Sequence, residues 1–336
     1  MTAFASSPAP APAPAAATAT ARSWLTHTLS AFGPFIGLVA ICILFAALRW
    51  ETFVSWDNFA IILQQTAVIG IVALGMTLII IAGGIDLSVG SIIALGTVVV
   101  AHLLNLGWDA FSAAAAGVAA AAACGAFSGL LITRLRLLPF VVTLGMMGAL
   151  RGAAKGLAGE QPIYPDETWI NQLMLLGPRG TLPGGVWLML AFAGLTGLVL
   201  RFTRFGRHVF AVGSNELTAR LCGVPVERVK LLVYTLGGAF AGLGAVLQFA
   251  YLTGGDPTTA VGLELNIIAA VVIGGASLAG GQGSITGTLV GALIMSVVAN
   301  GCTKLGLSNW VQEIVTGGII IAAVLLDYLR RRSAQR

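Results

Sequence analysis

The chain has 336 residues, of which 57% are hydrophobic and only 9% carry charge. Soluble domains carry about 25% charged residues, so this composition excludes an ordinary soluble protein and leaves too little polar sequence for a separate catalytic domain. Long apolar blocks also exclude a transmembrane β-barrel, which shows short segments of alternating hydrophobicity. The net charge of +5 predicts no nucleic-acid partner, because the basic residues lie in loops between apolar spans, where membrane topology explains them.

The chain begins with an Ala/Pro-rich segment, residues 1–30, which we expect to be a disordered tail because it cannot bury apolar surface. It has no basic region ahead of an apolar core, so it is not a signal peptide. A membrane-spanning helix needs about 20 residues, and the remaining sequence has room for about ten such helices in the lipid bilayer. The expected spans are 33–49, 59–82, 88–106, 110–132, 138–158, 185–201, 230–252, 264–279, 284–302 and 310–328.

These spans predict an all-α polytopic membrane protein with one transmembrane domain, residues 31–329, and a basic tail, residues 330–336. The span 264–279 is short, and it either crosses the membrane fully or is a re-entrant segment.

Basic residues predict the orientation, because cytoplasmic loops of membrane proteins are enriched in Lys and Arg. Of the 18 Lys and Arg residues, 13 fall on one side, most of them in the loop 201–230 and at the C-terminus. Both termini are therefore expected in the cytoplasm. Five tryptophans fall at span ends on the opposite side, as in an interfacial aromatic belt: Trp50, Trp56, Trp108, Trp187 and Trp310. An acidic loop on that side, about 159–185, either meets an extracytoplasmic partner or is a solvated connector.

A polar segment, the first break, interrupts the most apolar part of the chain. It contains Gly83, Gly84, Asp86, Ser88 and Ser91. Such groups belong in a membrane only where protein or water surrounds them, so they are functional candidates. Asp86 either lines a pathway or inner gate, or caps the next helix with help from Ser88, and the two roles are compatible.

A second break, residues 274–284, interrupts the C-terminal half at Gly274, Gly275, Ser277, Gln282 and Ser284. Aligning the glycine pair 83–84 with the pair 274–275 matches Ser91 with Ser284 after a two-residue insertion. Interrupted helices at corresponding positions of internal repeats mark transport pathways. We therefore predict an internal repeat whose two breaks are parallel copies, both near the cytoplasmic mouth.

The loop 201–230 contains the pattern of a helix of about two turns. Ser214 is the expected N-cap, Glu216 suits the helix dipole, and Arg220 lies in the last turn. Gly223 follows as the C-cap and Pro225 prevents continuation. So short a helix is not stable alone in water, and it needs a surface from its own membrane domain or from a partner protein.

Motifs for catalysis and for energy coupling are absent from the sequence. It has no P-loop, no H-E-x-x-H zinc motif, and no recurring Asp, Glu and His inside the spans as an ion relay requires. We predict no enzymatic activity, no metal site and no cofactor in this chain, which conducts passively or takes its energy from elsewhere.

Four stretches resemble the permease subunits of bacterial ribose-type monosaccharide ABC importers, within the branched-chain amino acid/ribose permease superfamily. They are residues 75–91 (GMTLIIIAGGIDLSVGS), 138–146 (LPFVVTLGM), 213–216 with 219–224 (GSNE and ARLCGV), and 272–288 (VIGGASLAGGQGSITGT). The motifs are Gly-rich and therefore specific only in combination, and the resemblance runs from about residue 35 to 328.

The resemblance implies a monosaccharide permease in the bacterial inner membrane. It implies three partners, namely a cytoplasmic ABC ATPase that binds Mg-ATP, a periplasmic sugar-binding protein, and a second permease copy or a sister permease. The loop helix is then a coupling helix that contacts the ATPase through Ser214, Asn215, Glu216, Ala219, Arg220 and Gly223. The translocation pathway or gate is assigned to Gly83, Gly84, Asp86, Ser88, Ser91, Gly274, Gly275, Ser277, Gln282 and Ser284.

Two alternatives are compatible with the sequence. The first is a stand-alone secondary carrier or channel for a small polar solute, which needs neither ATPase nor binding protein. The second is an ABC permease for a non-sugar solute such as a branched-chain amino acid or a nucleoside. The run Ile85–Gly90 differs from the branched-chain amino acid permeases, so a sugar is favoured.

Overall fold

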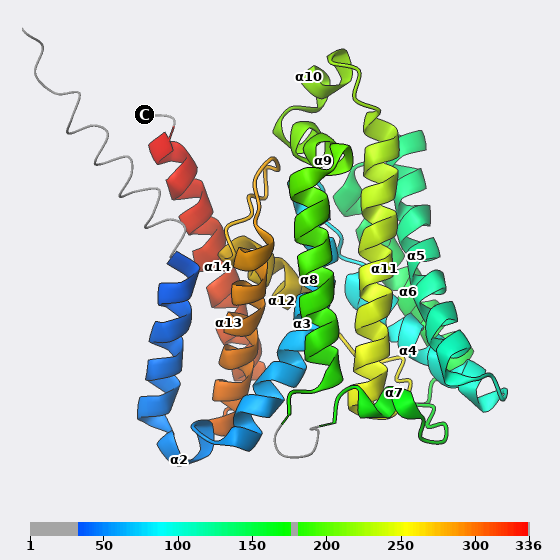
Figure 1. Ribbon diagram of the computed structural model, residues 1–336, viewed down its shortest axis with the longest axis vertical. Coiled ribbons are helices and arrows are strands. Elements are labelled where there is room, and N and C mark those ends of the chain that lie inside the picture. The colour runs from blue at the N-terminus through cyan, green and yellow to red at the C-terminus, as the bar shows by residue number, and fades with distance from the viewer. Residues whose placement is uncertain (1–32, 176–180, 335–336) are drawn as a thin grey trace, which may run out of the picture.

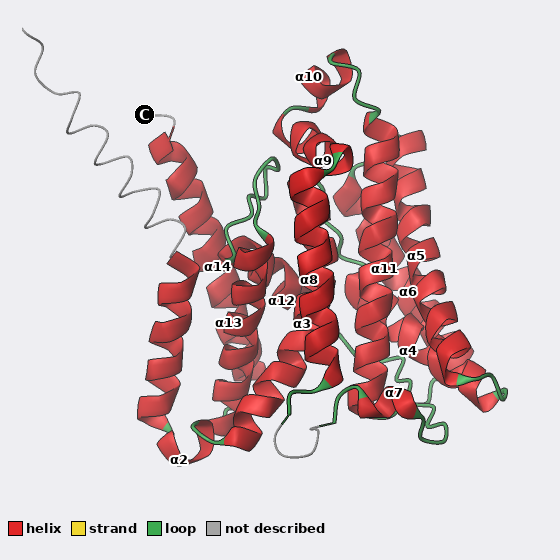
Figure 2. Cartoon of the chain, in the orientation of Figure 1, coloured by secondary structure: helices red, strands yellow, loops and turns green. Residues whose placement is uncertain are grey.

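The computed structural model describes residues 33–175 and 181–334, and within these ranges the chain is helical without a β-strand (Figures 1 and 2). The all-α fold class is confirmed, while the expected disordered tail, residues 1–30, lies outside the described residues. In chain order the helices are Gly33–Leu48, α2 (Trp50–Phe53), α3 (Trp56–Ile81), α4 (Val89–Asn105), α5 (Ala110–Arg134), α6 (Pro139–Ala158), α7 (Trp169–Gln172), α8 (Gly184–Phe202), α9 (Arg204–Ser214), α10 (Glu216–Leu221), α11 (Val226–Leu252), α12 (Leu263–Ile273), α13 (Ile285–Lys304) and α14 (Asn309–Ala334).

The helices match the expected spans. Five of them, α3, α5, α8, α11 and α13, are long and apolar enough to cross a membrane, and four shorter apolar helices and α6 complete the ten expected segments. Three boundaries differ by four residues or more: α11 begins at Val226 rather than at 230, α12 ends at Ile273 rather than near 279, and α14 ends at Ala334 rather than near 328. With 11 residues, α12 is about 16 Å long and does not cross a hydrocarbon core of about 30 Å. Helix α14 continues to Ala334, so the expected basic tail begins inside a helix.

Helix α3 lies at the centre of the molecule. Every residue from Thr66 to Ile81 is buried, and α8, α9, α11, α12 and α13 all pack against this helix. A helix that is apolar on all sides is buried by neighbours on all sides. The apolar sequence of α3 therefore agrees with its central position. By contrast, large apolar side chains on the outer helices, such as Ile43, Phe111 and Ile321, are more than half exposed and provide a lipid-facing surface.

Helices α5 and α11 approach each other closely at glycines. A Cβ on Gly238 would overlap the carbonyl oxygen of Ala121, and a Cβ on Gly125 would lie 3.0 Å from the Gly238 Cα. Helices in lipid gain no hydrophobic driving force from meeting, so close packing of small residues has to hold them together. Gly125 and Gly238 therefore fix the spacing of this helix pair.

The bundle has two distinguishable ends, with α9 and α10 at one and α2 and α7 at the other (Figure 1). We call them the α10 end and the α7 end. The loop 201–230, which carries six of the basic residues, belongs to the α10 end. The five expected belt tryptophans begin or follow helices at the α7 end and are each at least 50% exposed. The two ends therefore differ in charge and in aromatic content, as the two faces of a membrane protein do.

We predict that Gly238→Val lowers the thermal unfolding midpoint of the chain in detergent. The new side chain has no space beside Ala121, and overpacking of this kind costs about 1–3 kcal/mol. Gly148→Ala is the matched control, because a Cβ at this position in α6 meets no atom within 4 Å. The control should keep or slightly raise the midpoint through helix propensity, and equal midpoints for both variants would contradict the close approach of α5 and α11.

Candidate functional site

Helix α3 ends at the first break with a Schellman hydrogen-bond pattern. Gly83 has φ of +80°, a left-handed conformation that favours a residue without Cβ. The amides of Gly83 and Gly84 donate to the carbonyls of Ile80 and Ile79, both at 2.9 Å. The glycine pair thus satisfies the last carbonyls of α3 while the chain leaves the helix.

Helix α12 ends at the second break in the same way, but one residue later than the sequence alignment predicts. Gly275, with φ of +93°, is the left-handed residue, and the amides of Gly275 and Ala276 donate to Val272 and Val271 at 2.9 and 3.1 Å. The structural equivalent of Gly83 is therefore Gly275, whereas the aligned pairing with Gly274 is wrong. Two adjacent glycines do not reveal from sequence which one adopts the positive φ.

The connections after the two helix ends also differ from the expected alignment. Residues 84–87 lead to the α4 N-cap Ser88, and residues 276–283 lead to the α13 N-cap Ser284, so the second connection is four residues longer. The expected pairing of Ser91 with Ser284 is wrong, because Ser91 already lies inside the first turn of α4. The repeat consists of the same helix-break-helix arrangement with connections of unequal length.

The two breaks meet at the end of α9. The Gly281 amide donates to the Ile81 carbonyl at 2.9 Å, which joins the second break directly to the end of α3. A Cβ on Gly213 would overlap that carbonyl oxygen, and a Cβ on Gly280 would lie 2.7 Å from the Gly213 carbonyl oxygen. Backbones therefore pack here with no side chain between them. We call Ile81–Gly83, Gly213–Ser214 and Gly280–Gly281 the break junction.

Asp86 bonds to its neighbour rather than to the first turn of α4. One carboxylate oxygen, Oδ1, accepts from the Ser88 amide at 2.8 Å and from the Ser88 hydroxyl at 2.6 Å. Ser88 is the N-cap residue of α4 but makes no side-chain bond to it, so the expected joint capping takes the form of a local Asx turn. Asp86 is fully buried, and its Oδ2 atom has no hydrogen-bond partner among the described residues.

The Asp86 part of the first break faces α6 and α11. The hydroxyls of Thr143 and Tyr234 each lie 3.4 Å from the Ile85 carbonyl to which they donate. Ser91, in the first turn of α4, is also buried, and its hydroxyl has no partner within the described ranges. The structure therefore brings Gly83 to the second break, whereas Asp86 and Ser91 lie on another side.

The remaining candidates of the second break shape its turn. The Ser277 amide donates to the Gln282 carbonyl at 3.1 Å, and the Ser284 hydroxyl accepts from the Gly287 amide at 3.3 Å. Ser277 is buried while the side chain of Gln282 is exposed. Gly274 packs so closely against Gly287 of α13 that neither position has space for a Cβ.

The short helix of the 201–230 loop is confirmed as α10, with one change at its start. Asn215, not Ser214, is the N-cap, and its side chain accepts from the Thr218 amide at 2.9 Å. Ser214 is instead the last residue of α9, an amphipathic helix that the sequence analysis did not predict. The expected stop at Gly223 is confirmed, although the C-cap residue itself is Cys222. Gly223 follows it with φ of +80°, and its amide donates to the Arg220 carbonyl at 3.0 Å.

Ion pairs tie α10 to the start of α11. Glu216 bonds to Lys230 at 2.6 Å and to Arg220 at 3.3 Å, and Arg220 also pairs with Glu227. Burial alone would raise the pKa of Glu216, but the bonds from Lys230 and Arg220 outweigh it and hold the pKa below its ordinary value. Arg220 likewise lowers the pKa of the Glu227 carboxyl. The network is partly exposed, so its contribution lies in orientation more than in stability.

One exposed face of α10 is apolar. Leu217 and Leu221 are 75% and 88% exposed and lie one turn apart, so they share a face of the helix. Ala219, expected to contact a partner, is only 4% exposed and packs into the core of the chain. The two leucines were not predicted as site residues, although their four-residue spacing inside a polar loop is the signal that would have identified them.

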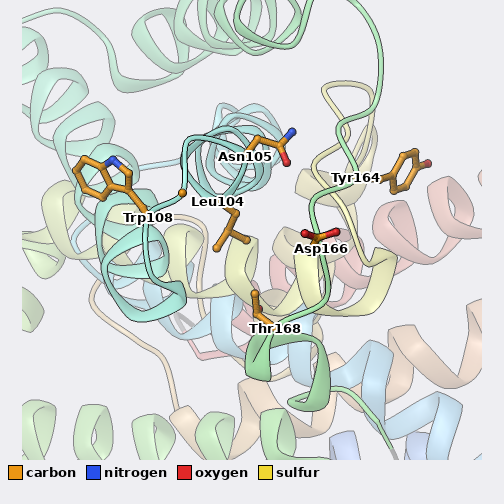
Figure 3. Close-up of a pocket in the computed structure, with 7 residues that line it drawn as sticks. Leu104, Asn105, Trp108, Tyr164, Asp166 and Thr168 are labelled. Carbon is orange, nitrogen blue, oxygen red and sulfur yellow. The ribbon is translucent and has the colours of Figure 1, made fainter.

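A shallow pocket of about 380 Å³ lies at the α7 end (Figure 3). Asn105 and Leu104 from the end of α4 face Asp166 and Thr168 from the segment before α7, as Figure 3 shows. Asp166 belongs to the loop that was expected to be acidic and solvated or partner-binding. The described residues contain no group of three His, Cys, Asp or Glu side chains suited to a metal ion.

Comparisons with known proteins find related membrane transport permeases. The family model described as "Branched-chain amino acid transport system / permease component" matches residues 58–324. The chain is similar to the ribose import permease protein RbsC of Escherichia coli K12, with 40% identity over 91% of this chain and 95% of the relative. Bacillus subtilis RbsC is 38% identical over 91% of this chain and 94% of its own length. The L-arabinose ABC transporter permease protein AraH of Azospirillum brasilense is 37% identical over 88% of each chain. No solved structure matches.

We predict that Asp86→Ala destabilises the chain in detergent, whereas Asp86→Asn is better tolerated. Alanine leaves the buried Ser88 amide and hydroxyl without their acceptor, which costs about 1–3 kcal/mol, while asparagine keeps a side-chain oxygen at Oδ1. Thermal unfolding midpoints of the three proteins measure this difference. An alanine variant as stable as the wild type would show that the Asx turn does not hold the first break.

Proposed function

This chain belongs to the family of branched-chain amino acid transport system permease components, and on that premise we propose that it is the membrane-spanning permease of an ABC importer for a monosaccharide. The family is one of transport subunits, so the chain is not an enzyme. The observation that carries the substrate class is its near full-length similarity to permeases named for ribose and for L-arabinose. Pentoses are thus the first substrates to test.

In this proposal the α10 end faces the cytoplasm and α10 contacts the ATPase. Three features of the chain support it. The exposed pair Leu217 and Leu221 offers an apolar surface that a groove on a partner can bury. The ion pair of Glu216 with Lys230 holds that surface at a fixed orientation to α11. Finally, the basic loop 201–230 lies at this end, and enrichment in Lys and Arg is typical of cytoplasmic loops. Both termini then lie in the cytoplasm.

The break junction then acts as an inner gate that responds to α10. Asn215 alone separates α9 from α10, and Ser214 packs against Gly281 while Gly213 packs against Ile81. A displacement of α10 by the ATPase therefore reaches the ends of α3 and α12 through one packed contact. Tightly packed contacts have few intermediate arrangements, so such a displacement switches the junction rather than bending it gradually.

The α7 end then faces the periplasm and receives the sugar from a binding protein. The acidic segment that contains Asp166, the pocket of Figure 3 and the exposed tryptophans all lie at this end. ATP and Mg²⁺ belong to the ATPase in this proposal, and the permease itself carries no cofactor. A second permease copy or a sister permease completes the pore, as the paired ATPases of such importers require.

The function is tested with the full chain in proteoliposomes, together with its ATPase and its binding protein. We expect uptake of radiolabelled D-ribose or L-arabinose that requires ATP on the α10 side and the binding protein on the α7 side. Uptake that continues without the ATPase and follows an imposed proton or sodium gradient would contradict the importer and establish a secondary carrier.

The ATPase contact is tested by Leu221→Asp. Burying a leucine contributes about 1.5–3 kcal/mol, so its loss should weaken binding of the ATPase to the permease at least about tenfold. Thr218→Ala is the matched control, since Thr218 is an exposed neighbour on α10 whose side chain contributes no large apolar surface. Affinity measured by biolayer interferometry on permease in nanodiscs gives the answer, and equal affinity of both variants would remove α10 from the interface.

A further inference from the structure

Residues 253–262, which join α11 to α12, form a strap that enters the bundle along α4. At the α7 end, Ile163 and Gly255 exchange two backbone hydrogen bonds of 2.8 Å. Gly255 packs against Thr97 and Ala101 of α4, whereas the Ala260 carbonyl lies beside Gly90, two turns nearer the start of that helix. The strap therefore runs inward from the α7 end to the first turn of α4, next to the first break.

Three polar side chains from three helices surround the inner part of the strap. Arg151 of α6 donates through Nη1 to the carbonyls of Pro257 and Thr259 at 2.9 and 2.6 Å. Gln248 of α11 donates to the Thr259 hydroxyl at 3.0 Å. Glu264 of α12 accepts from the Gly262 amide at 3.3 Å, and its other oxygen reaches Gly90. An arginine within a membrane helix is costly, and such residues mark pathways and ligand sites.

These side chains have more hydrogen-bonding capacity than the strap uses. Arg151 bonds to the strap through Nη1 and Gln248 through its amide nitrogen, so these contacts do not use Nε and Nη2 of Arg151 or Oε1 of Gln248. Ser91, the residue after Gly90, is 1% exposed and its hydroxyl is unpartnered within the same ranges. The Oδ1 atom of Asn266, two residues after Glu264, is also buried without a partner there. The first turn of α4 and the start of α12 therefore carry buried polar groups that the strap does not satisfy.

We propose that Arg151, Gln248 and Glu264 form a polyol-binding subsite on the translocation pathway, which the strap occupies in this closed arrangement. The Thr259 hydroxyl and the carbonyls of Pro257 and Thr259 stand where hydroxyl groups of a sugar bind once the strap withdraws. This inference rests on the proposed function and names the residues by which the permease itself contacts the substrate.

The chemistry of the subsite suits a neutral polyhydroxylated molecule. Guanidinium, carboxamide and carboxylate groups are planar, and each can bond two adjacent hydroxyls at once. Asp256 and Glu264 both lie within electrostatic reach of Arg151, so the positive charge is already balanced and the site disfavours an anion. Anchoring alone does not require these groups, because the backbone pairing with Ile163 already fixes the strap at the α7 end.

The test compares uptake of D-ribose with uptake of 2-deoxy-D-ribose, a neutral probe that lacks one hydroxyl, by the complete importer in proteoliposomes. The binding protein is the same throughout, so a change in the ratio of the two rates belongs to the permease. Gln248→Leu keeps the side-chain size but removes the hydrogen bond, and we expect the ratio of ribose to deoxyribose uptake to fall about fivefold. Arg151→Lys, which keeps the charge and loses the planar fork, should shift the ratio in the same direction.

Two further variants separate substrate binding from anchoring of the strap. Gln64→Leu is the matched control, because Gln64 is likewise a glutamine whose side-chain amide donates a hydrogen bond, here to the Met174 carbonyl, but it lies outside the subsite. The uptake ratio of this variant should equal that of the wild type. Thr259→Val removes the hydroxyl that occupies Gln248 and should raise uptake at low D-ribose concentration.

Equal loss of both sugars in the Gln248 and Arg151 variants, or a Thr259→Val variant with reduced uptake, would overturn the subsite and leave only an anchoring role. Because Thr259→Val leaves all three binding side chains in place, it decides the question even where Gln248→Leu does not assemble. A wild-type importer that moves no monosaccharide would instead contradict the proposed function, so the two failures are distinguishable.

Discussion

The hydrogen bond from the Gly281 amide to the Ile81 carbonyl shows the constraint that governs this molecule. Backbone groups that leave a helix within a membrane protein must find partners inside the chain, because lipid offers none. Each break meets this requirement with its own Schellman motif, and the Gly281 amide of the second break also bonds to the end of α3, while α9 packs against both. Glycines at 83, 213, 280 and 281 make the contact possible, since any Cβ at Gly213 would collide with the Ile81 carbonyl.

That constraint also links the regions to which we assign function. The break junction includes the end of α9, and α10 follows after a single capping residue, so the surface with Leu217 and Leu221 is mechanically close to both breaks. On the other side, the first break leads into α4, whose first turn meets Ala260 of the strap and Glu264 of α12. The first break is therefore connected at one end to the break junction, which leads to α10, and at the other end to the candidate sugar subsite.

The number and approximate ranges of the membrane helices were predictable, because spans of about 20 apolar residues are a property of composition and length. The stop at Gly223 was also predictable, because helix signals around it are local. The one-residue shift between the breaks was not, since a Gly-Gly pair leaves open which residue takes a positive φ. Helix α9 was missed because its apolar face is packed by the rest of the bundle, so Ser214 was taken for a cap that Asn215 provides.

The polar residues that carry our further inference were missed for a different reason. Arg151, Gln248 and Glu264 are far apart in sequence and each resembles an isolated polar residue near a span end. Only the path of the strap along α4 brings them together, and no local pattern encodes that path. Conversely, Asp86 was predicted as a site residue because it is the only acid in the first break. Its bonds to Ser88 show mainly a local structural role in this arrangement.

The most direct test of the gate is a reversible cross-link between α3, which precedes the first break, and α13, which follows the second break. Thr77 lies one turn before the end of α3 and Thr288 in the first turn of α13, and their buried hydroxyl oxygens are 2.8 Å apart. In a chain without its native cysteines, Thr77→Cys with Thr288→Cys places two sulfurs at this contact. We expect oxidation to abolish ATP-dependent sugar uptake and a reductant to restore it, because α3 and α13 must separate at this contact in each transport cycle. Uptake that is equal in the oxidised and reduced states would contradict the gate.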